Sequence, residues 1–459
     1  MTVRAWGVIF LILLLAAAGG GFWLRCEGTA PTIEAPEALL IGREGVSLVL
    51  RVSDPESGVR GVAIRLRHEK GDQVLFERAY AGNPFTGGIA KPDADPIEIA
   101  LDPESLGMGD GEAILEVSAK DWSLAETFRG NSRVLEIPIR VDLEPPRIGI
   151  ESGLTYVQRG GAAAVIYSLD EPTSRDGVEV GDAFFSGFPF PGEETGQAQE
   201  TPAGRRRFAI FAVPRDAAAN AAIRVVAVDE AGNRTTASWL TRLQERQFPD
   251  VRINLGGTFL SSKVPELASR LGVHENDPIA AFQLINSETR AANELRIREI
   301  VASSSAEHHW RGAFQQLRNS AVTSLFAEHR SYFAEGKKVS EAIHYGYDLA
   351  STAGAPITAA NAGRVIFADA LGIYGNCVIV DHGLGVTSLY AHLARIDVRE
   401  GDLLKQDQRL GLSGATGLAG GDHLHFAVMV GSTYVDPKEW WDPKWVREHI
   451  EARLATQAP

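Results

Sequence analysis

The first pattern along the chain is an uncharged, strongly apolar run near its N-terminus. From Trp6 to Leu24 no residue carries a charge, and Arg4 stands just before this run. About 20 apolar residues in a helix are enough to cross the hydrocarbon core of a membrane, and a preceding basic residue favours the cytoplasmic side. The alternative is a cleaved signal peptide, whose apolar core is usually shorter, about 7–15 residues. The length therefore predicts a single-pass anchor over residues 1–27, with the rest of the chain outside the cytoplasm.

Two stretches of short alternating apolar and polar runs follow, each about a hundred residues long, over 28–142 and 143–245. Gly, Pro and Asp separate the runs, as is typical of β-sandwiches. The second stretch closes with Val228-Asp-Glu-Ala-Gly-Asn233, an ending that resembles bacterial immunoglobulin-like modules. We interpret both stretches as immunoglobulin-like spacers. A carbohydrate- or protein-binding role in the cell envelope is the alternative, but no aromatic cluster in them indicates a ligand.

Helical spacing replaces this alternation between residues 246 and 332. Asp277-Pro278 is typical of the start of a helix. The stretch up to about Ala302 spaces apolar residues between charged ones, which predicts an amphipathic helix. Because this segment directly precedes the candidate site below, we expect it to cover that site and to regulate access. Three further histidines of this segment, His308, His309 and His329, follow. We interpret them as solvated residues on helix faces.

Composition limits the class of partner. Apolar residues make up 44% and charged residues 23% of the chain, as in ordinary globular proteins, so long disorder is not expected. The net charge of -14 argues against a nucleic-acid partner, because such a surface needs clustered Lys and Arg. With 47 Gly and 22 Pro, we expect many turns and a mainly β fold. Cys26 and Cys377 fall in regions that we place apart, so no internal disulfide is predicted.

The candidate chemistry lies in the last quarter of the chain, where three elements carry histidines. The first is His344-Tyr-Gly-Tyr-Asp348. Zinc hydrolases need three neutral or anionic protein ligands and one open position, and this element supplies two ligands. Gly346 between them lets the backbone pass close to an ion. Such a His-x-x-x-Asp pair by itself is weak evidence, since it is more often structural.

The second element is His423-Leu-His425, within an apolar strand. Alternation along the strand places both histidines on one face, so both enter the same cavity, where one can bind a metal while the other reaches the bound water. The third element is Tyr390-Ala-His392, which follows a Gly-rich turn between two predicted strands and places these two side chains on one face. The neighbouring His382 is interpreted as a surface residue of that turn.

In this order the motifs resemble those of the lysostaphin/LytM-type zinc metallopeptidases, which cut peptide cross-links of bacterial peptidoglycan. The resemblance covers about residues 330–441. It implies an antiparallel β domain, here 333–445, with Zn²⁺ held by His344, Asp348 and His425. It also implies that His392 and His423 flank the metal-bound water as the catalytic, proton-transferring pair. The motifs that carry it are His344-x-Gly-x-Asp348, Tyr390-x-His392-Leu393, Thr416-Gly417 and His423-Leu-His425-Phe426.

One position departs from the family pattern. Asp407 stands in a paired-turn stretch where Gly is commoner. Because Asp tolerates the left-handed backbone conformation, we expect the turn to be kept.

Together these observations predict a mainly β, multidomain protein. It comprises the anchor, two immunoglobulin-like sandwiches, the helical segment, the zinc peptidase domain and a C-terminal tail over 446–459. The predicted function is a zinc-dependent endopeptidase that hydrolyses cross-links between peptidoglycan stem peptides in cell-wall remodelling. It would be anchored in the cytoplasmic membrane and face the periplasm. The alternative is a non-catalytic envelope protein that binds peptidoglycan or activates another cell-wall hydrolase, but such relatives usually lack a ligand, whereas all five positions are filled here.

Overall fold

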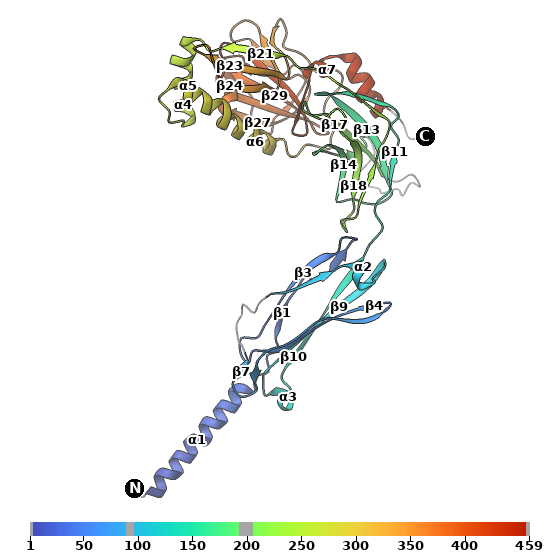
Figure 1. Ribbon diagram of the computed structural model, residues 1–459, viewed down its shortest axis with the longest axis vertical. Coiled ribbons are helices and arrows are strands. Elements are labelled where there is room, and N and C mark those ends of the chain that lie inside the picture. Colours follow the sequence, from blue (N-terminus) through green and yellow to red (C-terminus); the bar gives the residue numbers. More distant parts are fainter. Residues whose placement is uncertain (1–2, 89–95, 192–204, 456–459) are drawn as a thin grey trace. The chain divides into compact units, whose positions relative to one another are not determined.

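The computed structural model describes residues 3–88, 96–191 and 205–455, and strands dominate them, which confirms the mainly β prediction (Figure 1). The chain divides into two compact units. Unit 1 contains Met1–Pro146 and Val228–Arg234, and unit 2 contains Arg147–Ala227 and Thr235–Pro459. The sequence predicts more domains than these two units, and the boundaries between those domains stay predictions.

Unit 1 begins with helix α1, which runs from Val3 to Arg25. Over the residues that the structure describes, no helix is long and apolar enough to cross a membrane. The membrane anchor therefore remains a prediction of the sequence.

The rest of unit 1 consists mainly of two sheets around one hydrophobic core. Leu50, Ile64 and Val117 come from three different strands and are fully buried in this core, because every second side chain of each strand points inward. The first sheet has the order β1 (Thr32–Glu34), β3 (Val46–Ser53), β8 (Ile97–Leu101). The second has the order β2 (Leu39–Ile41), β10 (Ser132–Val141), β9 (Gly111–Asp121), β4 (Val59–His68), β5 (Gly71–Ala79). The short elements are β6 (Gly82–Asn83), β7 (Gly87–Gly88), α2 (Pro103–Leu106) and α3 (Ala125–Phe128).

Unit 2 begins with another pair of four-stranded sheets and a short parallel pair. One sheet is buried on both faces at its centre, since nearly every residue of its strand β13 is buried. Its order is β11 (Ile148–Ile150), β13 (Ala162–Leu169), β17 (Arg205–Ala212), β16 (Phe188–Pro189). The other has the order β15 (Ala183–Ser186), β14 (Arg175–Val180), β18 (Ile223–Val228), β19 (Arg234–Ala237). The parallel pair is β12 (Thr155–Gln158) and β20 (Thr241–Gln244).

An eight-stranded, antiparallel sheet forms the second part of unit 2 and carries the candidate site. Its order is β22 (Ala321–Ser324), β25 (Tyr347–Ala350), β33 (Leu424–Val430), β29 (Val386–Leu393), β28 (Asn376–Gly383), β27 (Gly363–Ala370), β31 (Leu403–Leu404), and β34 (Thr433–Val435) pairs with β33. Two three-stranded sheets flank it, with the orders β26 (Pro356–Thr358), β32 (Arg409–Leu412), β30 (Arg395–Ile396) and β21 (Asp250–Asn254), β23 (Glu328–Ala334), β24 (Lys337–His344). A 3-10 turn, η3 (Gly372–Tyr374), precedes β28.

The segment predicted to be helical over 246–332 is helical only from Phe259 to Ile300. Its helices are η1 (Phe259–Lys263), α4 (Val264–Leu271), α5 (Pro278–Leu284), η2 (Ile285–Thr289) and α6 (Arg290–Ile300). Asp277 caps α5 by accepting the backbone N–H groups of Ile279 and Ala280, which confirms the predicted helix start. The ends of the segment are strands, because β21 pairs in parallel with β23 and β22 pairs with β25. Such long-range pairing leaves no local signal in the sequence.

The predicted C-terminal tail is also folded over most of its length. Helices α7 (Pro437–Trp441), α8 (Pro443–Val446), η4 (Arg447–Glu451) and α9 (Ala452–Leu454) end the described chain. Val446 and Ile450 are fully buried in the core that runs through all of unit 2. The tail is held because its apolar side chains pack against β13.

A buried carboxyl group joins the two parts of unit 2. Glu439 of α7 accepts the backbone N–H of Ala162 at 2.9 Å and the amide of Gln158 at 2.8 Å. Burial raises the pKa of Glu439 to about 8, since the charged form loses its hydration. The folded state therefore favours the protonated carboxyl group.

This raised pKa predicts a pH-dependent stability. The contribution of Glu439 to the free energy of unfolding is complete below its pKa in the unfolded chain, near 4.5. It is lost as the pH rises through its pKa in the folded protein, about 8. We expect the free energy of unfolding of unit 2 to fall by on the order of 3 kcal/mol over this range because of Glu439, and Glu439→Gln to remove that part of the slope. Thermal unfolding between pH 5 and 8.5 would measure it, with the exposed Glu400→Gln as a control. An unchanged slope in Glu439→Gln would contradict the assignment.

Candidate metal centre

Three of the predicted site residues lie on neighbouring strands of unit 2. His344 ends β24, Asp348 lies in β25 and His425 lies in β33. Strands β25 and β33 pair antiparallel with Asp348 directly opposite His425. The register of one strand pair therefore brings together residues that are 77 positions apart in the chain. All three side chains are buried, and together they form a group whose geometry could hold a metal ion.

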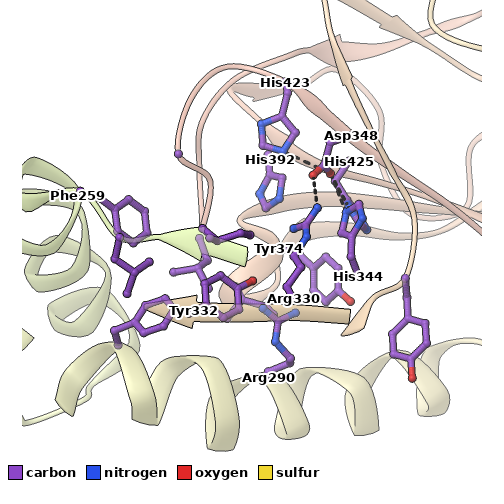
Figure 2. Close-up of a pocket in the computed structure, with 18 of the residues that line it drawn as sticks. Phe259, Arg290, Arg330, Tyr332, His344, Asp348, Tyr374, His392, His423 and His425 are labelled. Atoms are coloured by element: carbon purple, nitrogen blue, oxygen red, sulfur yellow. Dashed lines mark hydrogen bonds and ion pairs between the residues drawn. The ribbon is translucent and has the colours of Figure 1, made fainter. Parts of the chain in front are cut away.

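The ligand atoms of this group face one another at close range (Figure 2). Asp348 Oδ1 lies 2.9 Å from His344 Nε2 and 3.0 Å from His425 Nδ1, and the two nitrogens are 2.9 Å apart. His344 Nδ1 lies 2.9 Å from the carbonyl oxygen of Leu325, which can only accept a hydrogen bond. His344 Nδ1 therefore carries a hydrogen, and Nε2 is the nitrogen that faces the carboxylate oxygen.

This arrangement fits a divalent metal ion. Two imidazole nitrogens and a carboxylate oxygen converge at about 3 Å here, and His, His and Asp are ligands that Zn²⁺ accepts. The carbonyl behind His344 is the kind of partner that orients a metal-binding imidazole. His425 turns Nδ1 toward the same two groups, His344 Nε2 and Asp348 Oδ1. Burial lowers the pKa of His425 to about 4, which keeps the imidazole neutral, as a metal ligand must be.

The two predicted catalytic histidines border the same group. The ring centre of His392 lies 4.9 Å from that of His423 and 5.9 Å from that of His425. His392 donates from Nδ1 to the carbonyl of Thr416 at 2.8 Å, and burial lowers its pKa well below the usual range. Its backbone has φ +62°, a left-handed conformation that turns the side chain out of the strand alternation. The strand pattern alone could not show this turn.

His423 differs from His392 in its charge environment. It donates from Nδ1 to the carbonyl of Gly421 at 2.9 Å, and its Nε2 lies 3.5 Å from Asp348 Oδ1. Burial by itself would lower the pKa of His423, but the hydrogen bond to Asp348 and the charge of that group raise it above the usual value. The two histidines are therefore unlike in protonation although both face the same pocket.

Asp348 is the common partner of these groups. Burial alone would raise its pKa, but His344 and the hydrogen bonds of the other imidazoles lower it well below the usual value. Its second oxygen, Oδ2, accepts from Arg330 Nη2 at 3.0 Å. Arg330 is a site residue that no sequence motif indicates, because its contact with Asp348, 18 residues away, forms only in the folded chain. Its Nε also bonds to Glu328 at 3.1 Å.

The site lies in a pocket of about 350 Å³, which we call the site pocket. The four histidines and Asp348 form one side of it. Residues of the segment 246–332 form much of the other side, so that segment is a wall of the site. These residues, with two aromatic residues of the neighbouring strands and turns, are Leu255, Phe259, Phe282, Arg290, Tyr332 and Tyr374.

Several histidines lie elsewhere than predicted. His382 is completely buried, because β28 continues to Gly383 and the turn begins after it. Its Nε2 bonds to Ser388, which bonds to Tyr390, so Tyr390 belongs to this buried chain and not to the site pocket. The remaining three lie on no helix and do not line the site pocket: His308, His309 and His329.

The turn at Asp407 agrees with its prediction. Asp407 has φ +65°, the left-handed conformation expected for a residue in a Gly position. Its backbone N–H donates to the carbonyl of Ala359 at 3.0 Å, so the turn is closed against the neighbouring strand region.

Comparison with known proteins identifies this region. Residues 342–437 match Peptidase family M23. All five predicted site residues fall inside the matched range, so the region is an M23 peptidase domain and the resemblance seen in the sequence is confirmed.

Similar proteins match this chain over the same region. Peptidoglycan DD-endopeptidase ShyB of Vibrio cholerae is 36% identical over 115 residues, which are 25% of this chain and 26% of that protein. DD-carboxypeptidase/endopeptidase Mpg of Neisseria meningitidis is 36% identical over 95 residues, 21% of this chain and 22% of that protein. The chain thus covers only about a quarter of the length of these relatives. The catalytic domain of lysostaphin from Staphylococcus simulans is 29% identical and covers 28% of this chain and 96% of that domain, with a TM-score of 0.24, too low to support an argument.

Gly346 provides a test of the metal centre. A Cβ atom at this position would lie 2.7–2.8 Å from two atoms of the His425 imidazole and 2.6 Å from the carbonyl oxygen of Phe426. We expect Gly346→Ala to displace His425 and to weaken Zn²⁺ or Co²⁺ binding by roughly 10–100-fold, measured by calorimetric titration of metal-free protein. Gly420→Ala is the matched control, since a Cβ there meets nothing within 4 Å. Equal metal affinity in Gly346→Ala and the parent would refute this role.

Proposed function

We propose, from the M23 peptidase domain over 342–437, that this protein is a zinc-dependent endopeptidase that hydrolyses peptide cross-links of bacterial peptidoglycan. The observation that carries the proposal is the convergence of two imidazoles and a carboxylate at about 3 Å, with two further histidines beside them. The printed names of the relatives, peptidoglycan DD-endopeptidase and DD-carboxypeptidase/endopeptidase, support the substrate class. The alternative of a non-catalytic binding protein is less favoured, because every position of the site is filled.

We assign the zinc ligands to His344 Nε2, Asp348 Oδ1 and His425 Nδ1, the atoms that face one another. When bound, the ion would polarise the scissile carbonyl group and increase the acidity of water. The protein holds its ligands ready for this: Leu325 orients His344, and Arg330 holds the second oxygen of Asp348.

Proton transfer is assigned to the two remaining histidines. Thr416 fixes the hydrogen of His392 on Nδ1, which leaves Nε2 free to accept a proton. Gly421 holds His423 in the same way, but Nε2 of His423 faces the carboxylate of Asp348, which favours a proton on that atom. His392 is thus suited to take a proton from water, and His423 to stabilise the oxyanion or to protonate the leaving amine.

The parts outside the peptidase domain receive a supporting role. We propose that the sheets of unit 1 and the first sheets of unit 2 are immunoglobulin-like spacers, since in each case a pair of sheets encloses buried apolar side chains. Envelope proteins are the partners that such modules would meet. The uncharged run from Trp6 to Leu24 supports a single-pass anchor, with the catalytic domain in the periplasm.

The five site residues should fall into two groups on substitution. We expect His344→Ala, Asp348→Ala and His425→Ala to lose stoichiometric zinc and thermal stability, because metal binding stabilises the folded site. His392→Ala and His423→Ala should keep zinc and slow hydrolysis by about 10²–10⁴-fold. The measurements are elemental analysis and digestion of purified cell wall with identification of the released peptides.

His274→Ala, an exposed histidine outside the site pocket, is the control for these variants. If His423→Ala lost zinc while His425→Ala kept it, the two roles would be reversed. If all five variants digested cell wall like the parent, the site would be wrong.

The anchor has a separate test. If the N-terminal run spans the membrane, the protein isolated from membranes keeps its first residues, and the region after Arg25 is open to protease from the periplasmic side. Mass spectrometry of the mature protein measures the N-terminus. A mature start near residues 20–27 would refute the anchor and leave export intact.

A further inference from the structure

The site pocket contains two guanidinium groups, and they differ in their partners. Arg330 bonds to Asp348 and Glu328. Arg290, the first residue of α6, also lines the pocket, and Figure 2 shows it extending from that helix toward the side of the pocket where Tyr374 lies. Within the described residues, Arg290 forms no ion pair, and its Nε is buried without a hydrogen-bond partner. A buried charged donor without an acceptor is costly and calls for an explanation.

The position of Arg290 is fixed by its neighbours. Its Nη2 donates to Asn286 Oδ1 at 2.8 Å. Asn286 is itself buried, and its amide donates to Ser340 Oγ at 2.8 Å and to the carbonyl of Glu341 at 3.3 Å. One edge of the guanidinium is therefore occupied by a neutral amide that is held in place by β24. This contact orients the group and provides no ion pair for it.

Helix α6 is docked firmly against the site. Asn293 Oδ1 accepts the backbone N–H of Ile373 at 2.8 Å. The carboxylate of Glu294 accepts the hydroxyl groups of Tyr374 at 2.6 Å and Tyr434 at 2.9 Å. Glu294 lies one helical turn after Arg290, but both of its oxygens are occupied by tyrosines. Glu294 therefore forms no ion pair with Arg290, although its charge lies one helical turn away.

Tyr374 connects this helix with the metal centre. Its ring centre lies 5.7 Å from that of His425, and its hydroxyl group bonds to Glu294. Aromatic side chains, Phe282 and Tyr332 among them, line the same pocket and reduce access of water. A carboxylate that entered beside them would meet the guanidinium of Arg290 in a setting of low polarity, where a charge-assisted hydrogen bond is strong.

We propose that Arg290 binds a carboxylate group of the peptide substrate and so selects substrates that carry a free carboxylate close to the scissile bond. The proposal rests on the proposed endopeptidase function and adds a recognition element to it. The guanidinium geometry matches a carboxylate. Two sources share this chemistry, the C-terminal carboxylate of the peptide and a side-chain carboxylate of the residue after the scissile bond.

Three peptides distinguish these sources: acetyl-D-alanyl-D-alanine, its C-terminal carboxamide, and the carboxamide of acetyl-D-alanyl-D-glutamate. Binding to the full-length, zinc-loaded protein is measured by calorimetry, and hydrolysis by chromatography, for the parent, Arg290→Gln and Arg296→Gln. Arg296 lies on the same helix, pairs with Glu299 and does not line the site pocket, so it is the matched control.

We expect the parent and Arg296→Gln to bind one of the two carboxylate peptides at least tenfold more tightly than the neutral carboxamide. Arg290→Gln should lose this preference while keeping the affinity for the carboxamide. The carboxylate peptide that the parent prefers identifies the source. Three results would overturn the proposal. The parent could show no preference, it could bind neither carboxylate peptide measurably, or Arg290→Gln could lose affinity equally for all peptides. If the parent prefers a carboxylate peptide but hydrolyses neither peptides nor cell wall, the carboxylate site is kept and the proposed endopeptidase function is refuted.

Discussion

The site depends on one buried carboxylate that one guanidinium group and three imidazoles share. Asp348 Oδ1 faces His344, His425 and His423, and its Oδ2 is held by Arg330. A buried charge is tolerated only where such partners surround it. The β25–β33 register places this carboxylate opposite His425. The strand pairing that builds the sheet therefore also brings Asp348 and His425 together, and a slip of one residue would turn these two side chains to opposite faces.

The segment before the peptidase domain is part of the same folded body. Phe282 and Ile285 are fully buried in the core that unit 2 shares, and β21 pairs with β23. Removing the chain before Ala321 would therefore expose apolar surface and break the sheet that contains β21. This segment is thus not a separate lid over the site. Its hydrogen bonds to Ile373 and Tyr374 shape the pocket from the side opposite the ligands. These contacts join this segment to the residues that border the candidate metal centre.

Rigid support of the site comes from apolar burial and from a few buried polar links. Glu439 connects the last helices with the sandwich of unit 2 through Gln158 and Ala162. His382, Ser388 and Tyr390 form a second buried chain beneath the large sheet. Each such link needs complete pairing, because an unpaired polar group in a core costs stability. These links support the strands that carry the candidate site residues.

The sequence by itself determined the mainly β class and the peptidase family, and it predicted five candidate site residues through the family's motifs, because alternation and short motifs are local signals. It also determined the cap at Asp277 and the left-handed turn at Asp407, which depend on single residues. Other features depend on contacts between distant residues and were decided by the tertiary structure. The strands at the ends of the segment 246–332, the burial of His382 and the pairing of Arg330 with Asp348 are of this kind. The different partners of the two pocket arginines are likewise a result of packing. Only the folded chain brings a carboxylate to Arg330 and an amide to Arg290.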